Sequence, residues 1–155
     1  MAVLSPDSSI DEVTAVLERD GFAIVQGALS ADEVKAKRDE VLRVLALTPR
    51  GRNNFEGFET QRVYALFAKT RAFDEPATRP LVLGVLERVL GSFQLSAPQA
   101  IQIGPGETAQ PLHRDDGVYP IARPHRDLIV NTMWALDDFT EANGATPVSY
   151  THLRA

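Results

Sequence analysis

The triplet His113-Arg114-Asp115 has the residue types and spacing best suited to chemistry in this sequence. On an extended strand, residues i and i+2 point to the same face, so His113 and Asp115 would both reach one metal ion while Arg114 points away. A histidine nitrogen and a carboxylate oxygen form two-thirds of the 2-His-1-carboxylate triad, which leaves positions on Fe(II) open for O₂ and a co-substrate. Taken alone, the triplet fits an ordinary surface histidine beside two acids equally well.

The composition limits the kinds of site that this chain can carry. It has 155 residues and no cysteine, which excludes disulfides and thiolate metal sites and leaves histidines and carboxylates as the metal ligands. The net charge of −5 argues against a nucleic acid or an anionic membrane as the main partner. Without a secretory signal or a long apolar run, the chain is expected to be cytoplasmic. A cofactor-free hydrolase lacks support, because there is no G-x-S-x-G elbow and no cysteine nucleophile.

The first half of the chain is predicted to be mainly helical. Two S-x-x-E capping boxes, Ser9–Glu12 and Ser30–Glu33, predict the starts of two helices. Gly21 is expected to end the first helix, and the second should end before Pro49. A third helix is predicted over Pro80–Leu90, where a wide apolar set indicates a well-buried element.

Extended segments are predicted to dominate the second half of the chain, which gives an order of helices first and antiparallel strands later. The residues Gly51–Thr60 form a loop by composition. A short strand at Phe22–Val25 is the exception in the first half. The remaining expected features are a strand at Phe93–Ile103, a turn at Gly104–Gly106, an extended piece at Thr108–Asp115, a strand at Asp127–Leu136 and a hairpin turn at Asn143–Gly144.

Three segments resemble the phytanoyl-CoA dioxygenase family of 2-oxoglutarate oxygenases. The two around the triplet are IQIGPGETAQPLHRDDG, residues 101–117, and VNTMWALDDFTEANGAT, residues 130–146. The segment DGFAIVQGALSADEV, residues 20–34, is similar to the usual opening of that family. Because the matches occur in the right order and spacing, they are more specific together than any one alone.

This resemblance implies an α+β fold: a double-stranded β-helix (jelly roll, cupin-like) with N-terminal helices packed against it, incomplete at the C-terminus. It implies Fe(II) bound by His113, Asp115 and a distal histidine, with 2-oxoglutarate as co-substrate. Together with O₂ these would hydroxylate a small organic substrate and release succinate and CO₂. Related halogenases lack the carboxylate ligand, so the presence of Asp115 favours hydroxylation.

The resemblance also suggests residues around the co-substrate, each with an alternative explanation. Gln102 is similar in position to residues that line the 2-oxoglutarate site, but a polar residue on an exposed strand is equally possible. Trp134 fits an aromatic against the co-substrate, although core packing explains it as well. Asn131 needs hydrogen-bond partners, either at the site or in the sheet. His125 is interpreted as a loop histidine and not as a ligand.

The sequence departs from the family pattern after Thr146. The family continues with a turn similar to PGSH, which ends in the distal histidine, and later with an arginine for 2-oxoglutarate. Here the chain ends with PVSYTHLRA, and VSYTHLRA resembles the translation of an adapter used in transposase-based DNA library preparation. We therefore expect a partial oxygenase domain over residues 1–146 and a non-native tail over 147–155. His152 is one residue short of the expected ligand position and is a doubtful third ligand.

A second functional class stays open: a non-catalytic jelly-roll module that binds a small molecule or a metal. The presence of both His113 and Asp115 favours the enzyme, because a domain without catalysis has no need of both. The expected partners are a small-molecule substrate and O₂. The sequence does not indicate which substrate is used or whether the chain forms oligomers. As written, the 155-residue product is expected to be inactive and poorly soluble, because a jelly roll without its last strands leaves an open edge.

Overall fold

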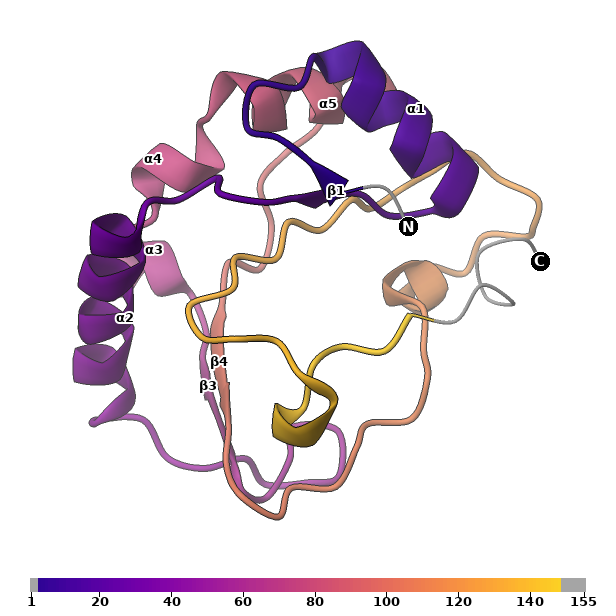
Figure 1. Ribbon diagram of the computed structural model, residues 1–155. Helices are drawn as coiled ribbons and strands as arrows, with labels where there is room; N and C mark the ends of the chain where they lie inside the picture. The colour runs from indigo at the N-terminus through magenta and orange to yellow at the C-terminus, as the bar shows by residue number, and fades with distance from the viewer. Residues whose placement is uncertain (1–2, 149–155) are drawn as a thin grey trace.

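The structure, a computed structural model, describes residues 3–148 and combines helices with short strands (Figure 1). The helices are α1 (Ile10–Asp20), α2 (Ala31–Leu45), α3 (Leu66–Lys69), α4 (Asp74–Ala77) and α5 (Pro80–Leu90). The strands are β1 (Val3–Leu4), β2 (Ile24–Val25), β3 (Thr60–Val63) and β4 (Ala100–Ile103). Two 3-10 turns, η1 (Asp115–Val118) and η2 (Glu141–Asn143), lie in the last third. A mixed helix and sheet architecture is therefore confirmed.

Both predicted capping boxes are present and fix the starts of α1 and α2. The Ser9 hydroxyl accepts a hydrogen bond from the Glu12 N–H at 3.2 Å, and the Glu12 carboxylate accepts one from the Ser9 N–H at 2.7 Å. Ser30 and Glu33 repeat this exchange at 3.3 and 2.7 Å. Gly21 follows α1 with φ at +77°, a left-handed conformation that glycine adopts without steric cost. Local sequence alone thus determines where these helices begin.

The strands form two separate two-stranded sheets. β1 pairs with β2 in parallel, and β3 pairs with β4 antiparallel, with Gln61 opposite Gln102. Because side chains alternate along a strand, Gln61 and Val63 share one face of β3 and Arg62 points to the other. The Gln61 amide donates to the carbonyl oxygen of Leu45 at 3.0 Å, which places this face against the end of α2.

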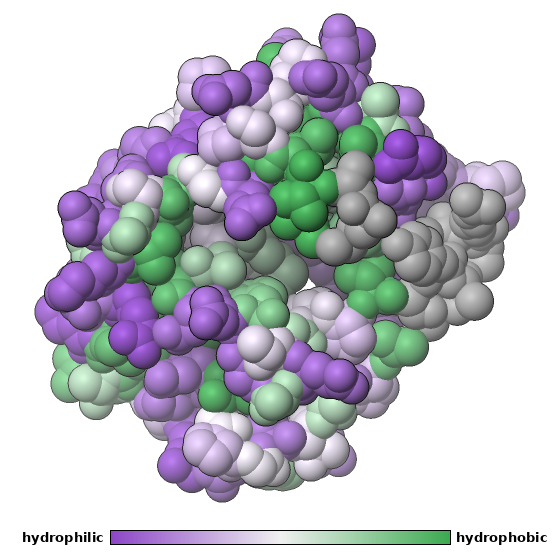
Figure 2. All heavy atoms as spheres, viewed as in Figure 1, coloured by the Kyte–Doolittle hydropathy of each residue, from purple (hydrophilic) through white to green (hydrophobic). Residues whose placement is uncertain are grey.

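The core lies between α2 and β3. Val63 and Leu45 are almost completely buried, and the side chain of Leu66 closes the core from α3. The buried members of this cluster are Val41, Val44, Leu45, Val63, Leu66 and Phe73, with Leu136 among the half-buried residues packed against it. Figure 2 shows further apolar residues in the hollowed middle of one face, surrounded by hydrophilic ones. The second half of the chain thus returns to the helical half to complete the core.

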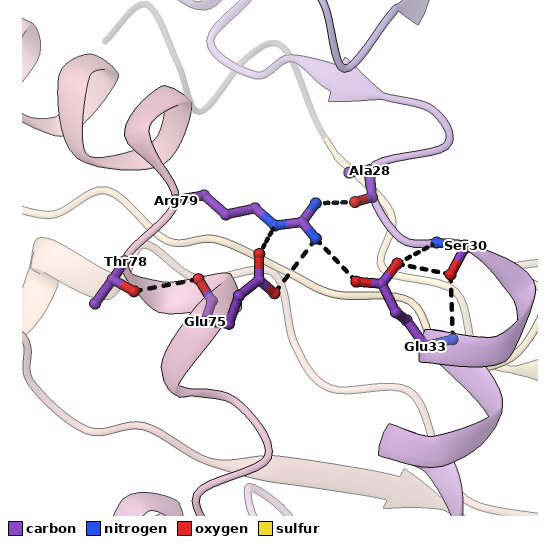
Figure 3. A network of polar contacts seen from close by, with 6 residues as sticks. All are labelled: Ala28, Ser30, Glu33, Glu75, Thr78 and Arg79. Carbon is purple, nitrogen blue, oxygen red and sulfur yellow. Dashed lines mark hydrogen bonds and ion pairs between the residues drawn. The ribbon is translucent and has the colours of Figure 1, made fainter.

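Arg79, at the N-cap position of α5, ties three elements together (Figure 3). Its guanidinium donates to the carboxylate of Glu75 at 2.6 Å, to Glu33 at 3.3 Å and to the carbonyl oxygen of Ala28. The same group lies over the ring of Trp134, 5.5 Å from its centroid. The network joins the starts of α2 and α5 to α4, and it holds the returning chain against them.

The bounds predicted for the third helix are confirmed, since α5 spans Pro80–Leu90 and packs against α1. The prediction that it is well buried is only partly right. Val85 is buried, but the other apolar residues on this helix are half-buried, and Leu83 is exposed. Helix α5 is covered mainly along the line where α1 packs.

The strand predictions for the second half are largely wrong. Of Phe93–Ile103 only Ala100–Ile103 forms a strand, and Asp127–Leu136 is not a strand. The extended piece expected at Thr108–Asp115 joins neither sheet of the described residues, and Asp115 begins η1. Gly144 has left-handed backbone after η2 but joins no two strands within residues 3–148. An apolar β-branched run becomes a strand only when a partner accepts its hydrogen bonds, and this partner is decided by tertiary structure. The two small sheets of the described residues therefore do not show the expected jelly roll directly, and that part of the fold stays a prediction.

Candidate metal centre

His113 and Asp115 lie side by side at the start of η1. The Nε2 atom of His113 is 3.4 Å from Oδ1 of Asp115, and the two side chains are 42% and 50% exposed. The expected geometry of one straight strand is wrong, because Asp115 begins a 3-10 turn. The side chains nevertheless converge, so one metal ion of moderate size can contact both from the solvent side.

The second ring nitrogen of His113 determines which nitrogen is available to a metal. Nδ1 lies 2.9 Å from the carbonyl oxygen of Pro111. A carbonyl can only accept a hydrogen bond, so Nδ1 must carry the proton when this bond forms. In the neutral ring, Nε2 is then the nitrogen without a proton, and it lies 3.4 Å from Asp115 Oδ1. A protein commonly orients a metal-binding histidine in this way.

The carboxylate of Asp115 has different partners for its two oxygens. Oδ2 accepts a hydrogen bond from the side-chain nitrogen of Asn131, whereas Oδ1 faces His113. Asn131 comes from the segment that was predicted as a strand, sixteen residues further along the chain. This contact brings one of the three suggested co-substrate residues directly to the candidate ligand pair.

The loop before β3 contributes an aromatic wall beside this pair. The ring of Phe55 meets the imidazole of His113 in a T-shaped arrangement with 5.4 Å between centroids. The side-chain oxygen of Asn53 accepts hydrogen bonds from the N–H groups of Phe55 and Glu56, and Gln110 donates to the Phe55 carbonyl oxygen. Hydrogen bonds thus hold this loop in its own turn and also attach it to the segment that leads to His113.

Within residues 3–148, no group of three or more histidine or carboxylate side chains is arranged to hold a metal ion. His125 belongs to a separate pair, because its Nε2 lies 3.6 Å from Asp116 Oδ2 and its Nδ1 contacts the carbonyl oxygen of Arg126. His152, the doubtful third ligand, lies outside the described residues. Within residues 3–148, His113 and Asp115 are therefore candidate ligands without a third partner of these types.

The other two suggested co-substrate residues lie elsewhere. Gln102 is on β4 opposite Gln61, on the face directed at α2, and lines a shallow cavity of about 210 Å³ with Arg50 and Glu59. Trp134 is half-buried, with the Arg79 guanidinium over its ring. The structure thus joins Asn131, but neither Gln102 nor Trp134, to the pair. Their proposed contacts with 2-oxoglutarate stay predictions.

Comparison with known protein families identifies the group of proteins to which this chain is related. The profile described as phytanoyl-CoA dioxygenase (PhyH) matches residues 17–154. The chain belongs to the phytanoyl-CoA dioxygenase family. The predicted family resemblance is therefore confirmed. The range that matches the family includes both His113 and Asp115.

Three curated relatives of this family member come from fungi. "Dioxygenase ALT11" of Alternaria alternata is 31% identical over 169 residues, covering 94% of this chain and 55% of the relative. "Dioxygenase olcK" of Penicillium canescens is 28% identical, covering 94% and 57%. "Dioxygenase FUM3" of Gibberella moniliformis is 30% identical, covering 90% and 53%. The chain spans about half the length of the curated relatives that it matches.

In the part of this phytanoyl-CoA dioxygenase family member that the structure describes, no helix is both long and apolar enough to cross a membrane.

Sequence reasoning missed the residues that support the site from a distance. Phe55 contacts His113, and Gln110 donates to the Phe55 carbonyl oxygen. Neither residue carried a spacing signal, because both contacts depend on how the loop folds back. Glu107 is a similar case: its carboxylate accepts hydrogen bonds from the Glu59 N–H at 2.7 Å and the Thr60 hydroxyl at 2.9 Å. Burial raises the pKa of Glu107, but these and other hydrogen bonds outweigh it and lower the pKa overall.

Proposed function

We propose that the gene for this chain encodes an Fe(II)- and 2-oxoglutarate-dependent dioxygenase that hydroxylates a small organic substrate. The observation that supports this proposal best is the convergence of His113 Nε2 and Asp115 Oδ1, each oriented by a hydrogen bond through its remote atom. Membership of the phytanoyl-CoA dioxygenase family and relatives named as dioxygenases support an oxygenase. The cytoplasmic location, and a small-molecule substrate and O₂ as partners, belong to the same proposal.

The donor set fits the metal that the family implies. One imidazole nitrogen and one carboxylate oxygen suit Fe(II), and a chain without cysteine offers no thiolate that would select zinc or copper. His113 and Asp115 would hold the metal, and their exposure leaves the opposite side open to other ligands. Bound iron with 2-oxoglutarate would supply oxidation by O₂, giving hydroxylated substrate, succinate and CO₂.

The proposal includes the parts of the protein that complete the fold. A distal histidine, an arginine for 2-oxoglutarate and the late strands of a jelly roll would follow Thr146 in the natural protein, with residues 147–155 as a non-native tail. Sequencing the source locus downstream of the codons for Asp137–Thr146, with a different library method, tests this directly. A frame that continues into a histidine-containing turn supports the proposal. A genome that encodes PVSYTHLRA and a stop codon contradicts it and returns His152 to consideration.

The activity is tested on the protein encoded at the source locus. We expect succinate release from 2-oxoglutarate that requires Fe(II) and O₂ and falls at least 100-fold in His113→Ala and Asp115→Ala, because each removes a metal ligand. His125→Ala is the matched control, since its histidine pairs with Asp116 and not with the metal ligands. Equal activity in His113→Ala and His125→Ala would rule out the proposed centre.

One observation favours a second candidate, a non-catalytic module that binds a metal or a small molecule. The described residues bring only two ligand side chains together, and two ligands can bind a metal weakly without supporting turnover. Metal binding that depends on His113 and Asp115, with no succinate release from the protein encoded at the source locus, would favour this module over the oxygenase.

A further inference from the structure

We propose that Asn131 is a positioning residue that holds the Asp115 carboxylate in the orientation needed to bind the metal. The inference rests on the proposed function, because it assumes that Asp115 is a metal ligand. It goes beyond that function by giving Asn131 a role through Asp115 instead of a contact with 2-oxoglutarate.

The geometry of the carboxylate supports this role. The Asn131 side-chain nitrogen donates to Oδ2, and Oδ1 lies 3.4 Å from Nε2 of His113. A half-exposed aspartate without a partner would rotate between several orientations, and most of them would turn Oδ1 away from the histidine. The hydrogen bond to Oδ2 selects the orientation in which Oδ1 and Nε2 face the same point.

The chemistry of the two groups assigns the direction of this bond. An ionised carboxylate can only accept hydrogen bonds, so the amide must present its nitrogen and not its oxygen to Oδ2. Asn131 is neutral, and it therefore holds the carboxylate without neutralising the charge that attracts a metal cation. A positively charged residue at this place would compete with the metal for the same carboxylate.

The two candidate ligands are thus oriented in the same manner. The Pro111 carbonyl oxygen accepts a hydrogen bond from His113 Nδ1, and the Asn131 side-chain nitrogen donates one to Asp115 Oδ2. In each side chain, the atom that faces away from the other candidate ligand makes a hydrogen bond. The atom that faces the other candidate ligand is left for the metal. Partners of this kind typically change metal affinity or activity by about 10- to 100-fold when they are removed. Because Asp115 is half exposed, we expect an effect near the lower end of this range.

The experiment uses the protein encoded at the source locus and titrates it with Co(II), without 2-oxoglutarate, while recording the visible absorption of the bound metal. Asn131→Leu keeps the side-chain size but removes the donor, and Asn131→Ala removes both. We expect both variants to bind Co(II) about tenfold more weakly. We also expect an altered absorption band at saturation, which a loss of general stability would not produce. Thr132→Val is the matched control, because it removes a hydroxyl from the adjacent exposed residue.

The outcomes separate this inference from the proposed function. Unchanged Co(II) affinity and spectrum in both Asn131 variants, with weaker binding in His113→Ala and Asp115→Ala, would overturn the role of Asn131 alone. An effect of Asn131 that appears only when 2-oxoglutarate is present would also overturn it, since the residue would then contact the co-substrate. Unchanged binding in His113→Ala and Asp115→Ala would overturn both proposals.

Discussion

The ring of Phe55 meets the imidazole of His113 edge to face, with 5.4 Å between centroids and an angle of 62° between planes. Edge-to-face pairs contribute about 0.5–1.5 kcal/mol beyond the burial of their surface. Phe55 is 58% exposed, so the lower end of this range applies here. The contact limits the movement of the histidine that the site depends on most.

From this contact we expect Phe55→Ala to shift the imidazole resonances of His113, because the ring current of Phe55 is lost. Metal affinity should fall about twofold, the equivalent of the lower contact energy. The measurement is a long-range ¹H–¹⁵N NMR spectrum, with His113→Gln to assign the signals. Phe58→Ala is the matched control, because Phe58 is in the same loop and is 54% exposed. The same imidazole shift in both variants would mean that Phe55 has no specific contact with His113.

Arg79 is expected to stabilise the fold through the network in Figure 3. Its side chain is 22% exposed and bonds to Glu75, to Glu33 and to a backbone carbonyl while covering Trp134. We predict that Arg79→Ala lowers the free energy of unfolding by about 2–3 kcal/mol, because it leaves charged partners unpaired. Arg79→Lys should lose less, since it keeps the charge but not the planar fork.

Urea denaturation followed by far-UV circular dichroism measures the effect of these Arg79 variants. Arg19→Ala is the control, because Arg19 forms an ion pair with Asp20 while 60% exposed, and such pairs contribute about 0–1 kcal/mol. If Arg79→Ala destabilises the fold no more than Arg19→Ala does, the network contributes no more to the free energy of unfolding than an exposed ion pair.

Acid is expected to destabilise the protein between about pH 4.5 and pH 2. The hydrogen bonds from Arg52 lower the pKa of Glu56 to about 2 from the ordinary value of 4.5, and those from Arg43 and Thr70 do the same for Glu40. A folded-state pKa below the unfolded value gives stability that is present above pH 4.5 and is lost as the pH falls towards 2. Glu56→Gln should therefore reduce the slope of stability against pH in this range, measured by the thermal midpoint. Glu18→Gln, on the exposed side of α1, should leave the slope unchanged.

Gly104 is expected to tolerate no side chain. A Cβ atom there would overlap the backbone carbonyl oxygen of Glu59, which cannot move without breaking the end of the β3–β4 pair. We predict that Gly104→Ala destabilises the protein by about 1–3 kcal/mol, the usual effect of overpacking. Gly117→Ala is the control, because a Cβ at Gly117 meets nothing within 4 Å. Equal urea midpoints for the two variants would show that the close approach at Gly104 is relieved at little cost.

The sequence could predict features that depend on neighbouring residues along the chain. The capping boxes at Ser9 and Ser30 and the bounds of α5 are confirmed because a helix satisfies its backbone groups within itself, so local side chains decide where it starts. The strand predicted over Asp127–Leu136 is wrong because a strand needs a partner, and nothing in its own residues indicates which segment will pair with it.

In the candidate site, too, some features follow from the sequence and others depend on tertiary structure. By itself the sequence determined that His113 and Asp115 are close in the chain, that no thiolate can replace them, and that the chain resembles its family. Only tertiary structure decided that Asn131 reaches Asp115, that Phe55 reaches His113, and that Trp134 lies under Arg79. These contacts join residues from distant parts of the chain, and they form only after the backbone has folded, because side-chain bonds act over a few ångströms.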